Sequence, residues 1–93
     1  MREIRRTTAF KRDYKREKRG PHGKELNELV SEIVLALAND EKLQPARRDH
    51  ALTGDWRGFR DCHLKPDLVL IYGKQDPTAL DLVRLGSHSE LFE

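Results

Sequence analysis

The chain has 93 residues, of which 37% are hydrophobic and 37% are charged, and its formal net charge at pH 7 is +2. A chain this short builds one modest hydrophobic core, so we expect a single domain over residues 1–93 that a binding partner would stabilise. The lone Cys62 excludes an internal disulfide, and the charged first residues form no apolar leader, which predicts a cytoplasmic protein without a membrane span.

Positive charge is concentrated at the start of the chain. Residues 1–24 contain ten Lys and Arg against three Asp and Glu, whereas residues 25–93 contain eight against thirteen. Such a basic block is typical of a surface that binds the phosphate backbone of RNA, although a solvated helix face has the same composition. The candidate RNA contacts are Lys11, Arg12, Lys15 and Arg16.

The first elements are a short strand and a helix. Residues 3–7 alternate weakly in polarity, which predicts an edge strand. Residues 9–19 predict a helix that Thr7 or Thr8 would cap. Gly20 would end this helix in the left-handed conformation that glycine adopts without strain.

The second helix has the clearest pattern in the chain. Between residues 24 and 38, apolar side chains recur at steps of three and four, while glutamates occupy the opposite side. Together with residues 9–19, this segment predicts a helical hairpin. The apolar positions are Leu26, Leu29, Val30, Ile33, Val34 and Leu37.

After Pro45 the apolar spacing changes to steps of two, which is typical of strands. Residues 55–63 predict a strand that Gly58 bends, residues 67–72 predict a central strand, and residues 79–85 predict the last strand. This order favours an α+β fold in which a two-helix hairpin packs on one face of a small antiparallel sheet. The other face would be open and free to carry a site.

Three histidines, His50, His63 and His88, flank the predicted strands, and Asp67 and Arg84 lie near them. These residue types could cleave RNA without a metal ion, if the 2′-hydroxyl attacks the adjacent phosphorus. Histidine, with an ordinary pKa of about 6.5, suits both proton transfers, and the planar arginine fork suits the charged phosphorane. Taken one at a time, each of these residues is more simply interpreted as a surface or structural residue.

A longer pattern in the C-terminal half carries a family resemblance. The run DHALTGDWRGFRDCHLKPD over residues 49–67, then LIY over residues 70–72 and RLGSHSELF over residues 84–92, resembles the YafQ branch of the RelE/ParE superfamily of toxins. The resemblance implies a RelE-like fold and a ribosome-dependent mRNA interferase of a type II toxin–antitoxin system. It also implies three partners, a cognate antitoxin, the ribosome and mRNA, and no cofactor.

The resemblance also implies roles for individual residues. His88 would be the general acid, and Arg84 would hold the scissile phosphate. His50, His63 and Asp67 would supply and orient the general base, and the sequence does not divide these roles among them. The products would be a 2′,3′-cyclic phosphate or 3′-phosphate and a 5′-hydroxyl.

Five further residues have simpler interpretations or depart from the family pattern. Phe92 would stack on a nucleobase, because aromatic faces accept any base. Leu68 stands where the family has a tryptophan, and if that tryptophan contacts the substrate, codon preference would differ here. Trp56 is interpreted as packing within the sheet, Cys62 as buried and inert, and His22 as a surface residue of the helix joint.

Two other functions fit parts of the sequence. Three histidines and an aspartate could form the zinc site of a metal-dependent nuclease, but their spacings match no helical His-x₃-His pair, and the Arg84 cation would oppose a nearby metal. A non-catalytic protein of the same fold that binds RNA, the ribosome or an antitoxin would explain the basic block, but not the histidines at the strand ends.

Overall fold

The computed structural model describes residues 1–92 of the chain. Two single turns of 3-10 helix, η1 (Pro45–Arg47) and η2 (Gly54–Trp56), lie between the second helix and the third strand. The other elements are β1 (Glu3–Arg6), α1 (Thr8–Lys18), α2 (Leu26–Ala38), β2 (His50–Ala51), β3 (Arg60–Lys65), β4 (Leu68–Gly73), β5 (Ala79–Gly86) and α3 (His88–Phe92).

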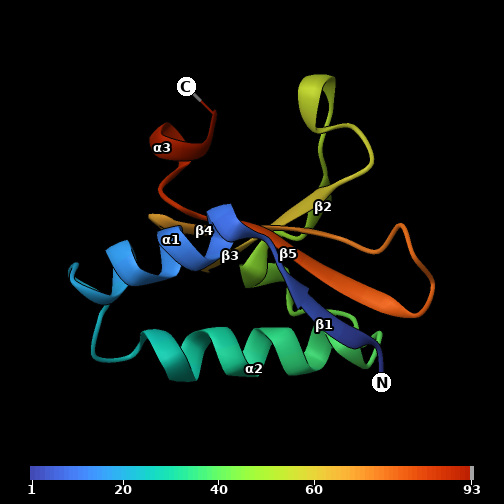
Figure 1. Cartoon of the computed structure of the whole chain (residues 1–93), viewed down its shortest axis with the longest axis horizontal. Helices are drawn as coiled ribbons and strands as arrows, with labels where there is room; N and C mark the ends of the chain where they lie inside the picture. The colour runs from blue at the N-terminus through green and yellow to red at the C-terminus, as the bar shows by residue number, and fades with distance from the viewer. Residues whose placement is uncertain (93) are drawn as a thin grey trace.

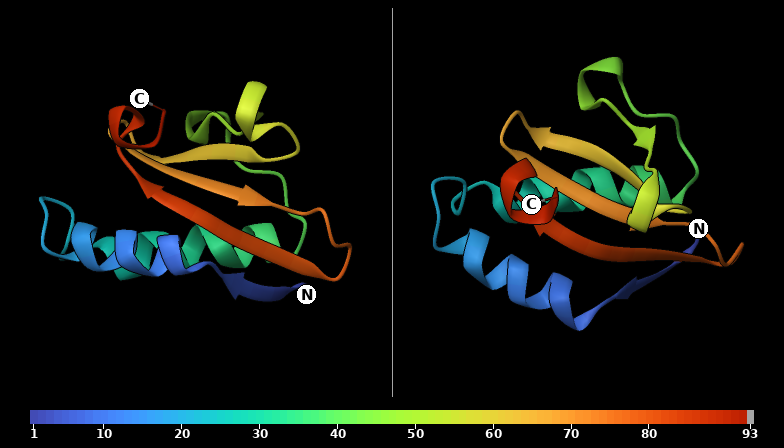
Figure 2. Two further views of the ribbon diagram at one scale, coloured as in Figure 1. Left: turned by 45° about the horizontal axis from the view of Figure 1, so that its top comes forward. Right: turned by 90° about the horizontal axis from the view of Figure 1, so that it is seen from above.

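The five strands form one sheet in the order β1-β5-β4-β3-β2 (Figure 1). The α1–α2 hairpin lies on one side of the sheet, and α3 and η2 lie on the other (Figure 2). The predicted α+β fold is confirmed with one correction, because β1 runs parallel to β5 and the sheet is mixed rather than antiparallel. The chain between these two strands runs through both helices and through β2, β3 and β4, and it returns so that β5 points in the same direction as β1.

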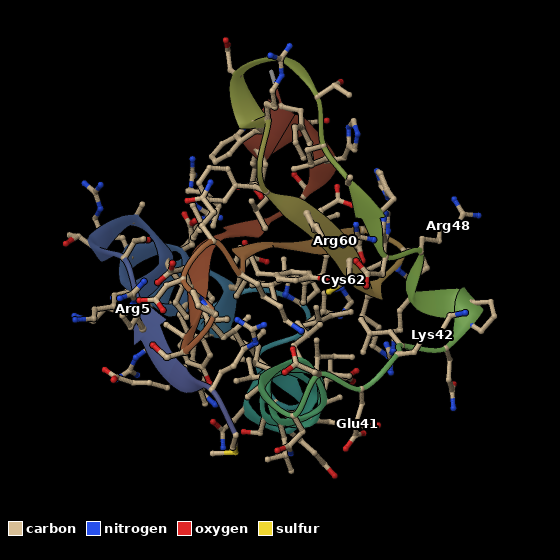
Figure 3. All side chains as sticks on the ribbon, turned by 90° about the vertical axis from the view of Figure 1, so that its right-hand side faces the viewer. Arg5, Glu41, Lys42, Arg48, Arg60 and Cys62 are labelled. Carbon is tan, nitrogen blue, oxygen red and sulfur yellow. The ribbon has the colours of Figure 1, made fainter. Side chains whose placement is uncertain are left out.

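The larger hydrophobic core lies between the helical hairpin and the sheet. Phe10 of α1 and the apolar side of α2 pack on alternate residues of the three central strands. Cys62 belongs to this core (Figure 3), and burial raises the pKa of its thiol to about 12, which agrees with the expected inert role. The strand residues in the core are Cys62, Leu64, Leu68, Leu70, Tyr72, Leu80, Leu82 and Leu85.

A smaller apolar cluster covers part of the opposite face, which the sequence predicts to be open. Val69 and Ile71 of β4 pack there against Leu91 of α3. The rings of Trp56 and Phe59 pack beside them edge to face, with centroids 5.9 Å apart, so Trp56 packs on the sheet as expected. The rest of this face, along β2, β3 and the end of β5, carries polar side chains; we call it the site face.

The predicted boundaries of the strand over residues 55–63 were wrong. β3 begins only at Arg60, because the preceding residues form the η2 turn. Gly58 then adopts a φ of +94°, a conformation that favours glycine, and this kink separates the turn from the strand.

The joint between the two helices also differs from the expectation. Gly20 does not adopt a positive φ, and α1 ends instead in a tighter turn in which Gly20 N–H donates to the Glu17 carbonyl oxygen. The glycine that the joint requires is Gly23, where a Cβ would lie 2.1 Å from the carbonyl oxygen of Lys18. Within residues 1–92, no helix is long and apolar enough to cross a membrane.

Candidate active site

Four side chains line up across this side of the sheet, and three of them are polar residues of the site face. The strand registers place His50 of β2 beside Asp61 of β3, Asp61 beside Ile71 of β4, and Ile71 beside Arg84 of β5. Directly paired residues of antiparallel strands have Cβ atoms about 4.5–5.5 Å apart. The sheet therefore places two predicted site residues, His50 and Arg84, at the ends of one row, with an aspartate between them that the sequence analysis did not select.

The other two predicted histidines lie next to this row. His63 follows Asp61 by two residues on β3 and so shares its face, and His88 begins α3 soon after β5. Asp61 is close enough to His50, His63 and His88 for each ring, when charged, to lower the pKa of its carboxyl group. The structure thus gathers these three histidines around one carboxylate.

Asp61 is the buried centre of the group, with a side chain only 3% exposed. Its Oδ1 has no hydrogen-bond partner among the described residues, although Nδ1 of His50 lies 3.0 Å away. Burial raises the pKa of Asp61, and the charged histidines oppose this rise. A buried carboxylate that is incompletely paired is a mark of functional sites. In the sequence, Asp61 is marked by its position two residues before His63, which places both side chains on the same face of a strand.

The backbone sets the tautomer of His50. Its Nδ1 lies 2.8 Å from the carbonyl oxygen of Arg48, which can only accept, so Nδ1 carries the hydrogen of the neutral ring. Arg48 has a left-handed φ of 51°, and its side chain points away from the molecule (Figure 3). The free lone pair of His50 is therefore on Nε2, in an exposed ring that is ready to accept a proton.

The segment that carries His50 is anchored to the sheet through the residue before it. Tyr72 Oη donates to Asp49 Oδ1 at 2.6 Å, and Arg60 Nε donates to the same oxygen at 3.0 Å. Burial, followed by the hydrogen bond to Asp49, raises the pKa of Tyr72, so the phenol remains a donor. These bonds hold His50 at the edge of the site face.

Arg84 is held from α1 by a second buried aspartate, Asp13. Arg84 Nε donates to Asp13 Oδ2 at 2.7 Å, and Nη2 donates to Oδ1 at 3.2 Å. Among the described residues, Nη1 of Arg84 makes no hydrogen bond, so it is available to an external anion. No sequence motif marks Asp13, which stands among the basic residues of the first helix.

α3 presents His88 and Phe92 on one side. Ser87 N–H donates to Glu90 Oε1 at 2.9 Å and Glu90 N–H donates to Ser87 Oγ at 3.1 Å, a reciprocal pair that starts the helix. The rings of His88 and Phe92, four residues apart, have centroids 4.7 Å apart. His88 is exposed beside the row, whereas Phe92 is partly buried and packs against the apolar cluster that includes Leu91.

Asp67 lies apart from the histidine group in the exposed turn between β3 and β4. Its described partner is His22 of the helix joint, whose Nε2 is 2.8 Å from Asp67 Oδ1, and this hydrogen bond lowers the pKa of Asp67. The sequence predicts Asp67 to lie near the histidines, but the strand register shifts between His63 and Lys65, and Asp67 pairs with the helix joint instead. His22 is expected to be a plain surface residue, but in the structure it forms a hydrogen bond with Asp67, one of the predicted site residues.

The four basic candidates of α1 are of two kinds. Lys11, Arg12 and Lys15 are exposed, and within residues 1–92 their side chains make no hydrogen bond or ion pair. Arg16 instead donates through Nη2 to the carbonyl oxygen of Leu85 at 2.9 Å and also pairs with acidic side chains around it. Three cations are thus available to external phosphates, while Arg16 belongs to an internal network.

The groups of the site face suit proton transfer beside a phosphate. His50 offers a free Nε2, His88 offers an exposed ring, and Arg84 offers a fixed positive charge. Among residues 1–92, no three His, Cys, Asp or Glu side chains are placed to hold a metal ion together.

Asp61→Asn is expected to raise the free energy of unfolding at pH 7 by about 1 kcal/mol, because it removes a buried, poorly paired charge. The raised pKa means that the folded protein binds this proton more tightly than the unfolded chain. Wild-type stability should therefore fall as pH rises from the ordinary range of aspartate through the raised pKa, and Asp61→Asn should lack this fall. Chemical denaturation at pH 4 and pH 7 measures both effects, with the exposed Asp55→Asn as control. An equal difference from wild type at both pH values would contradict the prediction.

Known proteins resemble this chain over its whole length. The family model of the YafQ bacterial toxins of type II toxin–antitoxin systems matches residues 2–93. The mRNA interferase toxin YafQ of Escherichia coli strain B is 34% identical over 92 residues, which cover 99% of this chain and 97% of that protein.

Solved structures show the same similarity. The toxin of the E. coli DinJ–YafQ complex has a TM-score of 0.83 and 32% identity, with all of both chains covered. A metal-bound toxin from Helicobacter pylori has a TM-score of 0.82 and 40% identity, and the match covers 99% of this chain and 100% of that chain. The resemblance read from the sequence is therefore confirmed, and the chain belongs to the YafQ family of bacterial toxins of type II toxin–antitoxin systems.

Proposed function

We propose that this chain is an endoribonuclease that cleaves mRNA on the ribosome by attack of the RNA 2′-hydroxyl on the neighbouring phosphorus. The E. coli relative is named an mRNA interferase, which supports the reaction class. The observation that carries the mechanism is the row on the site face, where the free Nε2 of His50 and the cation of Arg84 lie at opposite ends, with His63 and His88 beside it.

His50 is the general base in this proposal. Its Nε2 takes the proton of the 2′-hydroxyl as the 2′-oxygen forms its bond to phosphorus. The positive charge that develops on the ring is stabilised at Nδ1 by the Arg48 carbonyl and the nearby Asp61 carboxylate. His63, on the same face of β3, supports this step by orienting the substrate. Asp67 lies apart in the β3–β4 turn with His22 and has no part in this step.

His88 is the general acid. It gives its proton to the 5′-oxygen as the bond from that oxygen to phosphorus breaks, which leaves a 2′,3′-cyclic phosphate and a 5′-hydroxyl. Phe92, whose ring lies against His88, would stack on a base next to the cleaved bond and so place the leaving oxygen near the acid. Arg84 binds the phosphorane through the donors that Asp13 leaves free.

The exposed cations of α1 would bind ribosomal RNA. Replacing Lys11, Arg12 and Lys15 together by Gln should weaken ribosome binding and make it less sensitive to salt. Each lost phosphate contact should reduce the slope of log K against log salt by roughly 0.7–0.9. Binding titrations at several salt concentrations measure this slope, and Glu28→Gln and Glu32→Gln on the exposed side of α2 serve as controls. An unchanged slope in the triple variant would show that this face is only solvated surface.

A cognate antitoxin is the expected protein partner. The E. coli toxin of this family was solved in complex with DinJ. We propose an equivalent antitoxin for this chain, and we place both in the cytoplasm, where translating ribosomes provide the substrate. A partner that binds only the folded toxin would also stabilise its thin core.

A metal-dependent nuclease is the second candidate, because the H. pylori toxin has been solved in a metal-bound form. The two candidates differ in their response to zinc. Loss of cleavage with a zinc-selective chelator, and recovery on adding zinc, would favour the metal-dependent reaction.

Cell-free translation tests the proposed function directly. We expect the purified chain to cut a reporter mRNA inside its coding region, as mapped by primer extension, only when the start codon is intact. Equal cutting of a reporter without a start codon would contradict the dependence on the ribosome, and no cutting of either reporter would contradict the nuclease.

A further inference from the structure

The buried carboxylate of Asp13 receives four hydrogen bonds, although α1 is otherwise a basic helix. Arg84 supplies two of them, Arg16 Nη1 supplies one at 2.9 Å, and the backbone N–H of Leu85 supplies one at 3.0 Å. The residue is 3% exposed. Burial alone would raise its pKa, but the bonds from Arg84 and Leu85 and the charges of Arg84 and Arg16 together lower it, so Asp13 remains an anion.

This carboxylate sits at the edge of β5, where β1 has ended. β1 satisfies the β5 backbone up to Leu82, and Thr7 Oγ1 donates to the carbonyl oxygen of Val83 at 2.7 Å. Beyond that point α1 side chains replace the missing strand, since Asp13 accepts from Leu85 N–H and Arg16 donates to Leu85 O. Asp13 is therefore fixed by the backbone of the strand that carries Arg84.

Completing the β5 edge does not require a negative charge, because a neutral acceptor would satisfy the N–H of Leu85. The charge has a separate effect, since it holds the guanidinium of Arg84 in one bidentate geometry. A free arginine side chain loses much conformational entropy on binding a ligand, and a guanidinium that is already held loses less.

The same network reaches α3. Arg16 Nε lies 3.3 Å from Glu90 Oε2, and Glu90 is the residue that caps the start of α3. Gly86 is where these groups meet, since a Cβ there would lie 2.7 Å from Arg16 Nη2 and 3.1 Å from Glu90 Oε1. One buried anion thus connects the proposed phosphate-binding arginine with the helix that presents His88.

We propose that Asp13 is a positioning residue of the nuclease, which fixes Arg84 against the scissile phosphate and, through Arg16 and Glu90, fixes α3 with its general acid. This inference rests on the proposed function. Asp13 does not contact RNA in this proposal. Loss of its carboxylate should therefore reduce the rate of cleavage more than the affinity for the ribosome.

The test measures single-turnover cleavage of ribosome-bound mRNA over a range of toxin concentrations. Asp13→Asn keeps the shape and an acceptor for Leu85 N–H, and we expect its maximal rate to fall on the order of 10- to 100-fold, with little change in the half-saturating concentration. In an Arg84→Ala background, Asp13→Asn should reduce the rate only slightly, because its effect on Arg84 is already lost and only its effect on α3 remains. Asp81→Asn is the matched control, because Asp81 forms the same bidentate pair with Arg5 farther along β5.

Thermal unfolding of each variant separates loss of fold from loss of rate. If Asp13→Asn does not fold, Asp13→Glu retains the charge on a longer arm, and it should bind ribosomes normally but cleave more slowly than wild type. Wild-type rates in a folded Asp13→Asn, or in Asp13→Glu where Asp13→Asn does not fold, would overturn the inference, as would an equal loss with and without Arg84. If wild type itself does not cleave, the proposed function has failed rather than the role of Asp13.

Discussion

His88→Ala is expected to reduce cleavage of ribosome-bound mRNA on the order of 100-fold or more, because the 5′-oxygen would leave without a proton. The loss should appear in the maximal rate, since His88 lies on the exposed side of α3 and contributes little to the core. Single-turnover kinetics with saturating toxin measures it. Ser89→Ala, next to it on the same short helix, is the control and should cleave like wild type.

The pH dependence should change with this substitution. In wild type the rate should follow a bell-shaped curve, because one imidazole must be neutral and another must be protonated. His88→Ala should lose the fall at high pH, where wild type loses its protonated acid. A variant that keeps both the bell shape and the wild-type rate would show that His88 is not the acid.

Arg84→Ala is expected to cost about 3 kcal/mol of transition-state stabilisation, again a rate loss on the order of 100-fold. Arg84→Lys should recover only part of it, because a point charge cannot bind Asp13 and the phosphorane through one planar fork. Rates of the two variants under identical conditions measure the difference. Equal activity of Arg84→Lys and wild type would contradict the need for a bidentate group.

Arg84→Ala should also change the effect of pH on stability. Because the pKa of Asp13 is lowered in the folded protein, its contribution to stability is present above the ordinary pKa of aspartate and is lost as pH falls through the lowered one. Without Arg84 that pKa rises and the contribution shrinks. Denaturation curves at pH 3 and pH 7 should therefore differ less for Arg84→Ala than for wild type.

Helices and strands could be predicted where the spacing of apolar residues within one segment identifies the element. The repeat of α2 and the apolar run of β4 each bury a continuous face, so their spacing alone identifies them. The start of β3 could not be predicted from the spacing, because a 3-10 turn and a glycine at positive φ interrupt the segment before it. The parallel pairing of β1 with β5 depends on a contact between the two ends of the chain, which no local spacing encodes.

The candidate site could be predicted in part, from residues whose side-chain chemistry is distinctive. His50, His63 and Arg84 lie on three strands of one sheet, and His88 begins the short helix after β5, so the four surround one face. Two buried aspartates do not stand out by residue type, because an aspartate in a polar sequence resembles a solvated one until the tertiary structure covers it; only the spacing of Asp61 from His63 points to one of them. Asp61 and Asp13 differ in their partners, which explains why their pKa values shift in opposite directions.

Identification of the fragment ends tests the central claim most directly. Attack by the 2′-hydroxyl, with one histidine as base and another as acid, must leave a 5′-hydroxyl on one fragment and a 2′,3′-cyclic phosphate or its 3′-phosphate product on the other. Labelling the downstream fragment with polynucleotide kinase, with and without prior phosphatase treatment, reads the 5′ end. We expect full labelling without phosphatase. A 5′-phosphate, which is labelled only after phosphatase treatment, would show that water rather than the 2′-hydroxyl attacks, and would contradict the mechanism.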